Sequence, residues 1–94
     1  VGNVRAFVAA LAAGERYDLV FNICEGLGGY GREAQVPCLA EAYGMPCTFA
    51  DPLTATLTLH KGLAKRVLRD SGVPTTPFHL VTRMADLDTL DLPY

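Results

Sequence analysis

The stretch of this sequence with the clearest chemical potential runs from residue 22 to residue 37, Asn-Ile-Cys-Glu-Gly-Leu-Gly-Gly-Tyr-Gly-Arg-Glu-Ala-Gln-Val-Pro. Four of the six residues from Gly26 to Gly31 are glycines, and a carboxylate, Glu25, precedes them. Glycine suits backbone that adopts positive φ or that a ligand approaches closely. A glycine-rich turn between a buried strand and a helix is a common ligand site in open α/β sheets. We therefore expect this glycine loop, residues 25–31, to bind a small molecule.

More than one ligand chemistry is compatible with this spacing. The glycines match the G-x-G-x-x-G fingerprint of dinucleotide-binding domains, and Asp51 lies about 20 residues on, where such a domain has its ribose-binding acid. Glu25 weakens this interpretation because its carboxylate would lie beside a pyrophosphate, and the bulky Tyr30 occupies the turn. A loop for a substrate or nucleotide is favoured, while a dinucleotide loop and a loop without a ligand stay open.

Two charged residues could take part in binding. Glu25 follows an apolar segment that we expect to be a buried strand, where reactive groups of open α/β sheets gather. It could accept hydrogen bonds from an amine or pair with Arg32 and hold the loop. Lys61 lies early in an expected helix, where its ammonium and nearby N–H groups would favour a phosphate. We predict a phosphate contact for Lys61 and a solvated face for the other basic residues of that helix.

The remaining reactive residue types form no recognisable site. His60 and His79 have no partners at ligand spacing, and the three cysteines are an odd number without C-x-x-C spacing. No Ser/His/Asp or Cys/His arrangement is visible. We therefore predict no metal ligand and no catalytic residue within this chain, and we interpret the cysteines as buried thiols.

Composition narrows the class of protein. The 94 residues fit one small domain or part of a larger one, and a hydrophobic share of 50% with 19% charged residues allows a packed core. A net charge of −2 provides no basic surface for nucleic acid or an anionic membrane. No apolar run approaches the ~20 residues of a membrane helix. We expect a cytoplasmic protein that binds small molecules.

The elements that must position the loop follow from the apolar pattern. The pattern predicts a helix from residue 4 to 11 with Asn3 as N-cap, a strand over 17–23 and a helix from 32 or 33 to 43. A short strand over 47–50 and a helix from 53 or 54 to 71, in one or two pieces, follow. The last predicted elements are a strand over 77–82 and a helical start over 85–90. Val4, Phe7, Val8 and Leu11 form the apolar stripe of the first helix. This order predicts an α/β fold of three layers with a mostly parallel, Rossmann-like sheet.

One strand of that sheet is missing from the sequence. The first strand would precede the opening helix, so we expect an incomplete fragment. Because an unpaired sheet edge seeks a neighbour, we also expect self-association into a homo-oligomer.

The segment from Asp18 to Pro77 resembles D-alanine–D-alanine ligases, at the junction of their N-terminal domain and their ATP-grasp core. The residues that carry the resemblance are Leu19-Val20-Phe21, Glu25-Gly26-x-Gly28-Gly29, Gln35, Leu39 to Pro46, Lys61-Gly62-Leu63-Ala64-Lys65 and Ser71-Gly72-Val73-Pro74. Their order and spacing together are fairly specific. The resemblance implies that residues 1–52 form the latter part of a pre-ATP-grasp domain and that residues 53–94 begin the ATP-grasp central domain.

The resemblance also implies a function. Enzymes of this family use ATP and Mg²⁺ to phosphorylate a carboxylate, and an amine then attacks the acyl phosphate to form an amide bond. Lys61 matches a lysine that contacts ATP phosphates. The loop residues Glu25, Gly26, Gly28 and Gly29 would line the pocket for the first substrate. The magnesium ligands and the catalytic arginine would lie outside this chain, so we expect the fragment alone to be inactive.

The sequence departs from the family pattern within the substrate loop. Glu25 stands where the family usually has histidine, Tyr30-Gly31-Arg32 replaces Glu-Asp-Gly, and His60 replaces an aspartate. These differences favour a related carboxylate–amine ligase of unassigned specificity over one for D-alanine. A Rossmann-type NAD-binding domain and a small non-enzymatic interaction domain remain the alternatives.

Overall fold

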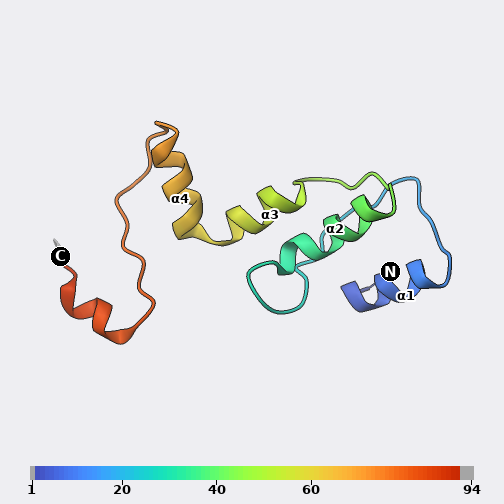
Figure 1. The fold of residues 1–94 in the computed structure, drawn as a ribbon, viewed down its shortest axis with the longest axis horizontal. Coiled ribbons are helices and arrows are strands. Elements are labelled where there is room, and N and C mark those ends of the chain that lie inside the picture. The colour runs from blue at the N-terminus through green and yellow to red at the C-terminus, as the bar shows by residue number, and fades with distance from the viewer. Residues whose placement is uncertain (1, 92–94) are drawn as a thin grey trace. The chain divides into compact units, whose positions relative to one another are not determined.

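The computed structural model describes residues 2–91, and helices make up nearly all of its regular structure (Figure 1). In chain order these are α1 (Val4–Ala12), the 3-10 helix η1 (Arg32–Ala34), α2 (Gln35–Ala42), α3 (Pro52–Leu59), α4 (Lys61–Asp70) and the 3-10 helix η2 (Met84–Thr89). The chain divides into two compact units, Val1–His60 and Lys61–Tyr94. No helix of the described residues is long and apolar enough to cross a membrane.

Local sequence explains where the helices of the first unit begin and end. Asn3 caps α1 as predicted, because its side-chain Oδ1 accepts a hydrogen bond from the Ala6 N–H at 3.0 Å. Gly14 and Gly44 follow α1 and α2 with φ of 91° and 69°, in the left-handed region that ends helices. Pro37 lies in the first turn of α2, where its missing N–H costs little.

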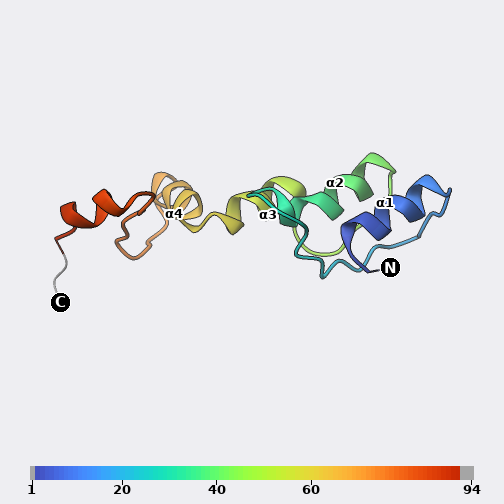
Figure 2. The same cartoon turned by 90° about the horizontal axis from the view of Figure 1, so that it is seen from below.

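The core of the first unit lies between α1 and α2, which run side by side (Figure 2). Its buried side chains are Val4, Phe7, Leu11, Val36, Ala40 and Met45. The predicted stripe of α1 is therefore confirmed in three of its four residues, whereas Val8 is 47% exposed. Tyr17, Val20 and Cys47 pack against this cluster from the segments that connect the helices.

The predicted three-layer, mostly parallel sheet is wrong for this chain. No strand occurs among residues 2–91, and the one trace of a sheet is an isolated parallel bridge between Val20 and Cys47. Two backbone hydrogen bonds make this bridge: the Val20 N–H donates to the Pro46 carbonyl at 2.8 Å, and the Thr48 N–H donates to the Val20 carbonyl at 2.9 Å. The segment 77–82, predicted as another strand, has no backbone partner in the described chain.

The bridge stays short for identifiable reasons. Beyond it, the Asn22 N–H donates to the side-chain Oγ1 of Thr48 at 2.9 Å instead of to a backbone carbonyl. Phe49 then adopts a φ of 69°, which turns the chain out of the extended direction. A strand needs hydrogen bonds from a neighbouring strand. The apolar sequence of residues 17–23 was therefore not enough to form one. Phe21 and Ile23 are 68% and 78% exposed, so the segment predicted to be a buried strand is covered only in part.

The long helix predicted after Asp51 consists of two pieces. His60 interrupts it with φ −86° and ψ 91°, which is extended geometry, so α3 ends at Leu59 and α4 begins at Lys61. Gly72, with φ of 77°, lies just beyond the end of α4 at Asp70, close to the predicted helix end at residue 71.

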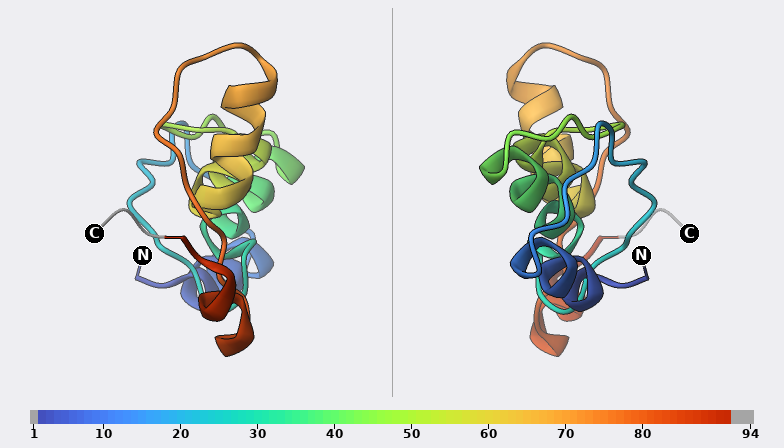
Figure 3. Two further views of the ribbon diagram at one scale, coloured as in Figure 1. Left: turned by 90° about the vertical axis from the view of Figure 1, so that its left-hand side faces the viewer. Right: turned by 90° about the vertical axis from the view of Figure 1, so that its right-hand side faces the viewer.

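The second unit consists of α4, the chain that runs back along it, and η2 (Figure 3). The Lys65 ammonium donates to the Thr76 hydroxyl at 3.0 Å, and the Phe78 ring lies 5.4 Å from that ammonium and 5.5 Å from the Arg69 guanidinium. These contacts hold the returning segment to one face of α4. Lys65 and Arg69, predicted on a solvated face, therefore partly contact the chain itself.

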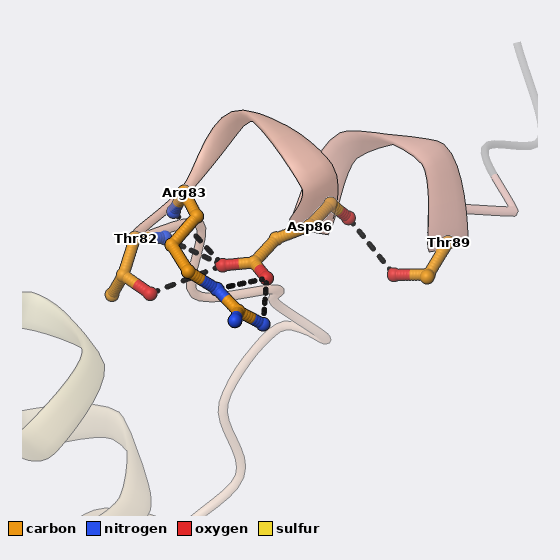
Figure 4. A network of polar contacts seen from close by, with 4 residues as sticks. All are labelled: Thr82, Arg83, Asp86 and Thr89. Carbon is orange, nitrogen blue, oxygen red and sulfur yellow. Dashed lines mark hydrogen bonds and ion pairs between the residues drawn. The ribbon is translucent and has the colours of Figure 1, made fainter.

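A polar network fixes the start of η2 (Figure 4). One carboxylate oxygen of Asp86 accepts from the Thr82 N–H, the Thr82 hydroxyl and the Arg83 N–H, each at 3.0 Å. The other oxygen forms an ion pair with the Arg83 guanidinium at 3.0 Å. Because the backbone N–H groups of Thr82 and Arg83 favour the charged form, the pKa of Asp86 is lowered. The Thr89 hydroxyl donates to the Asp86 carbonyl, so the network is structural.

Candidate functional site

The backbone of the glycine loop requires glycine at only some of its four glycine positions. Gly26, Gly28 and Gly29 adopt φ of 76°, 67° and 74°, whereas Gly31 does not adopt positive φ. Gly26 also lies against the backbone of Arg32, so closely that a Cβ atom there would overlap the Arg32 carbonyl. The close approach of residues 26 and 32 closes the loop at its base. The folded loop therefore requires glycine at positions 26, 28 and 29.

Side chains complete the closure of the loop. The Gln35 amide pairs with the backbone of Leu27: its Oε1 accepts from the Leu27 N–H at 3.0 Å and its Nε2 donates to the Leu27 carbonyl at 2.9 Å. The Arg32 guanidinium donates to the Gly29 carbonyl at 3.0 Å. This role of Gln35 was not predicted, although its position in the first turn of a helix after a glycine loop allows its side chain to reach back to the loop.

Glu25 lies where the extended segment enters the loop, and its side chain is exposed. The Glu25–Arg32 pair that the sequence left open is absent from the described residues, because the Arg32 guanidinium binds the Gly29 carbonyl instead. Glu25 lines a cavity of about 230 Å³ together with Glu33 of η1, for which the sequence predicted no role. Because η1 follows the loop directly, residues 25 and 33 both line this cavity.

The loop also contacts the end of α3 through an aromatic pair. The rings of Tyr30 and His60 lie 5.0 Å apart between centroids and are tilted by 48°. Both residues are departures from the family pattern described above. Their contact joins the outer part of the glycine loop to the point where α3 ends.

Lys61 is the first residue of α4 and is exposed. It belongs to the second compact unit, whereas the glycine loop belongs to the first. An ammonium at the first turn of a helix lies beside N–H groups that also favour an anion. The phosphate contact of Lys61 stays a prediction.

Asp51, the acid of the dinucleotide alternative, has a structural role. Its Oδ1 accepts a hydrogen bond from the Thr54 N–H at 2.7 Å and caps α3, with Pro52 at the first helical position. The hydrogen bond from Thr54 lowers the pKa of Asp51, since it favours the charged carboxylate. One oxygen of this exposed carboxylate thus caps α3, and the dinucleotide interpretation stays a prediction.

The possible metal ligands of the described chain do not cluster. Between residues 2 and 91, no group of three or more His, Cys, Asp or Glu side chains could hold a metal ion. Cys24, Cys38 and Cys47 are free, and Cys38 is exposed, contrary to the prediction that all three are buried. Desolvation raises the pKa of the Cys47 thiol, so this thiol resists ionisation.

Comparison with known proteins supplies the context of the loop. The chain is 43% identical over 65 residues to an uncharacterized protein, y4sG, of Sinorhizobium fredii. The matched residues make up 69% of this chain and 19% of that protein. It is 37% identical over 75 residues to a D-alanine–D-alanine ligase of Xylella fastidiosa, covering 80% of the chain and 24% of the ligase. A D-alanine–D-alanine ligase of Burkholderia cenocepacia is 40% identical over 60 residues, with 64% and 19% covered. Neither a protein-family model nor a solved structure matches the chain.

The resemblance to D-alanine–D-alanine ligases is confirmed, and the chain is a D-alanine–D-alanine ligase-like segment. It spans about a fifth to a quarter of the length of these relatives, 19% for one and 24% for another. What the relatives catalyse as whole proteins therefore extends to this chain as a proposal.

Proposed function

We propose that the protein containing this chain is an ATP- and Mg²⁺-dependent ligase that joins a carboxylate to an amine through an acyl phosphate. The observation that carries this proposal is the similarity to named D-alanine–D-alanine ligases, 37% over 75 residues in one case. The closed glycine loop and the position of Lys61 are compatible with it. The compartment that we propose is the cytoplasm, and the homo-oligomer expected from the sequence remains part of the proposal.

The proposed roles of the residues follow the chemistry of each step. A carboxylate oxygen of the first substrate attacks the γ-phosphorus of ATP and ADP leaves; the amine of the second substrate then attacks the acyl carbon, and phosphate leaves with that carboxylate oxygen. Lys61 would contact the phosphates, because a fixed cation stabilises charge on a transferring phosphoryl group. Glu25, Gly26, Gly28 and Gly29 would line the pocket of the first substrate.

Magnesium would supply further neutralisation of the phosphates. The acidic residues of the described chain form no group that could hold it, so we propose that its ligands lie elsewhere in the protein. We also keep as a proposal that residues 1–52 belong to an N-terminal substrate domain and residues 53–94 to the start of the nucleotide-binding domain.

Release of ADP tests this proposal. The complete protein, as its gene encodes it, is mixed with ATP, Mg²⁺ and a panel of amino acids in both enantiomers, and ADP is followed with a coupled assay. We expect ADP release that depends on an amino acid and stops when the magnesium is chelated. Absence of ADP release with every amino acid and amino-acid-derived carboxylate would refute the ligase proposal.

A further inference from the structure

Tyr30 lies at the tip of the glycine loop, in a turn that runs from Gly29 to Arg32. The Arg32 N–H closes this turn by donating to the Gly29 carbonyl at 3.4 Å, and the Arg32 guanidinium donates to the same oxygen at 3.0 Å. The backbone bond is longer than the roughly 2.7–3.2 Å of most N–H···O bonds. The turn therefore depends on side-chain contacts to keep one conformation.

The backbone around Tyr30 adds little rigidity of its own. Gly28 and Gly29 precede it with positive φ, and Gly31 follows it. Glycine loses more conformational freedom on folding than any other residue, so an ordered glycine-rich tip has to be stabilised by contacts. Tyr30 has the only side chain among residues 28–31. A contact of the Tyr30 ring is thus the means by which this part of the loop can be held from outside.

His60 provides such a contact from the end of α3. The two rings lie 5.0 Å apart between centroids and are tilted by 48°. Aromatic rings attract each other at centroid distances of about 4.5–7 Å. Tyr30 is 69% exposed, whereas His60 is half-buried, so His60 is the more fixed member of the pair.

The helix that carries His60 belongs to the packed part of the first unit. α3 contacts η1, its residue Ala55 is buried, and Asp51 caps its start. Tyr30 and His60 both lie in this unit. Their contact therefore connects the tip of the loop to a fixed helix that is distant in sequence, whereas the hydrogen bonds of Gln35 and Arg32 described above connect the loop to itself and to α2.

We propose that Tyr30 and His60 are positioning residues of the glycine loop: the contact of their rings holds the tip of the loop against the end of α3, in the conformation that the first substrate binds. Both act through the loop backbone and not on the reacting atoms. The inference rests on the proposed ligase function and deepens it at the loop that would line the substrate pocket. It gives a joint role to two residues that each depart from the family pattern.

Hydrogen exchange at the Arg32 amide of the complete protein tests whether the rings hold the turn. We expect exchange to be about three- to tenfold faster in Tyr30→Ala and in His60→Ala, as the loss of an aromatic pair predicts. The double variant should exchange no faster than the faster single variant, because all three lose the same contact. Effects that multiply in the double variant would show that the rings act independently and would overturn the inference.

Conservative variants and a matched control exclude a general loss of structure. His60→Phe and Tyr30→Phe each keep two rings, so exchange at the Arg32 amide should stay within about twofold of wild type. His79→Ala alters the other histidine of the chain, which is exposed in the second unit, and it should leave this exchange unchanged. Exchange as fast in His60→Phe as in His60→Ala would contradict a contact between rings.

Steady-state kinetics test whether the held loop serves the substrate. The complete protein is assayed with ATP, Mg²⁺ and the amino acid that gives the fastest ADP release. Because only molecules with the loop in place bind well, Tyr30→Ala and His60→Ala should raise the KM for that amino acid about three- to tenfold, with the KM for ATP changed less than about twofold. An equal rise in both KM values would assign the effect of His60 to the adjoining Lys61 and overturn the inference.

The exchange measurement keeps the two proposals separable, because it requires no turnover. Unchanged exchange at Arg32 in Tyr30→Ala and His60→Ala would overturn the inference whether or not the protein releases ADP. Absence of ADP release with every amino acid would refute the ligase function by itself, even with faster exchange in both variants.

Discussion

Individual glycines of the loop differ in what the backbone demands of them. Gly26 combines a φ of 76° with close contact to the Arg32 carbonyl, while Gly31 has neither positive φ nor any atom within 4 Å of where a Cβ would lie. The sequence identified a glycine-rich loop but could not rank its members. Which glycine is least replaceable depends on how closely the Arg32 backbone approaches Gly26, and only the folded loop shows this.

This difference predicts opposite outcomes for two similar substitutions. Gly26→Ala should lower the free energy of unfolding by about 2 kcal/mol or more, because it adds strain at positive φ and a steric overlap. Gly31→Ala is the control and should change stability by less than about 0.5 kcal/mol. Thermal unfolding of the two variants measures this, and equal melting temperatures would show that the loop does not close at Gly26.

Lys61 is predicted to act through its charge on the phosphates of ATP. Lys61→Ala in the complete protein should raise the KM for ATP by about ten- to a hundredfold, since one charge-assisted contact is lost. Arg66→Ala removes an exposed cation from the same helix and serves as the control. An unchanged KM in Lys61→Ala, or the same increase in both variants, would exclude a specific phosphate contact.

Among the elements, the helices were predictable and the strands were not. Helices form from local hydrogen bonds, so Asn3 could indicate the start of α1 and the apolar pattern could indicate a helix end near residue 71 from sequence alone. A strand requires a partner, and the sequence could not show that Phe49 would turn away after one bridge. The sequence predicted a helix after Asp51 in one or two pieces and did not locate the break. No proline or glycine at position 60 indicates the extended ψ that His60 adopts.

The cap of α3 gives a prediction for the effect of pH. Because the pKa of Asp51 is lowered from 3.8 in the folded chain, its stabilisation is fully present above pH 3.8 and is lost as the pH falls through the lowered value. Asp51→Asn keeps a capping oxygen without the charge. We expect wild type to lose melting temperature relative to Asp51→Asn as the pH falls from about 6 to about 3.

Asp51→Ala separates the cap from the charge. It should be less stable than Asp51→Asn at both pH values, because it lacks any capping oxygen. A difference between wild type and Asp51→Asn that does not vary with pH would contradict the charged cap.

The pairing of Gln35 with Leu27 predicts how the loop is held. Gln35→Ala removes two hydrogen bonds, and we expect it to cost about 1–2 kcal/mol of local stability and to speed hydrogen exchange at the Leu27 amide about tenfold. Exchange at the α1 amides, which lie in the other helix of the core, is the internal control. Unchanged exchange at Leu27 would mean that Arg32 and the loop backbone suffice to hold the loop.

At the scale of the whole molecule, the sequence predicted the family better than the architecture. The resemblance rested on residues spread from Leu19 to Pro74, and the similarity to D-alanine–D-alanine ligases confirms it. The cavity that Glu25 and Glu33 both line was not predictable, because it depends on the turn into η1 and on the position of α3. The sequence identified the loop as a candidate site, whereas the residues that lie beside it are determined by the fold.

The central claim is that this segment belongs to an enzyme that activates a carboxylate as an acyl phosphate. Its most direct test is to supply the complete protein with ATP, Mg²⁺ and an amino-acid substrate labelled with ¹⁸O in its carboxylate, and to analyse the released phosphate by mass spectrometry. The mechanism transfers a carboxylate oxygen to phosphorus, so one ¹⁸O atom should appear in the phosphate for each amide bond formed. Phosphate without label, released together with product, would contradict the claim.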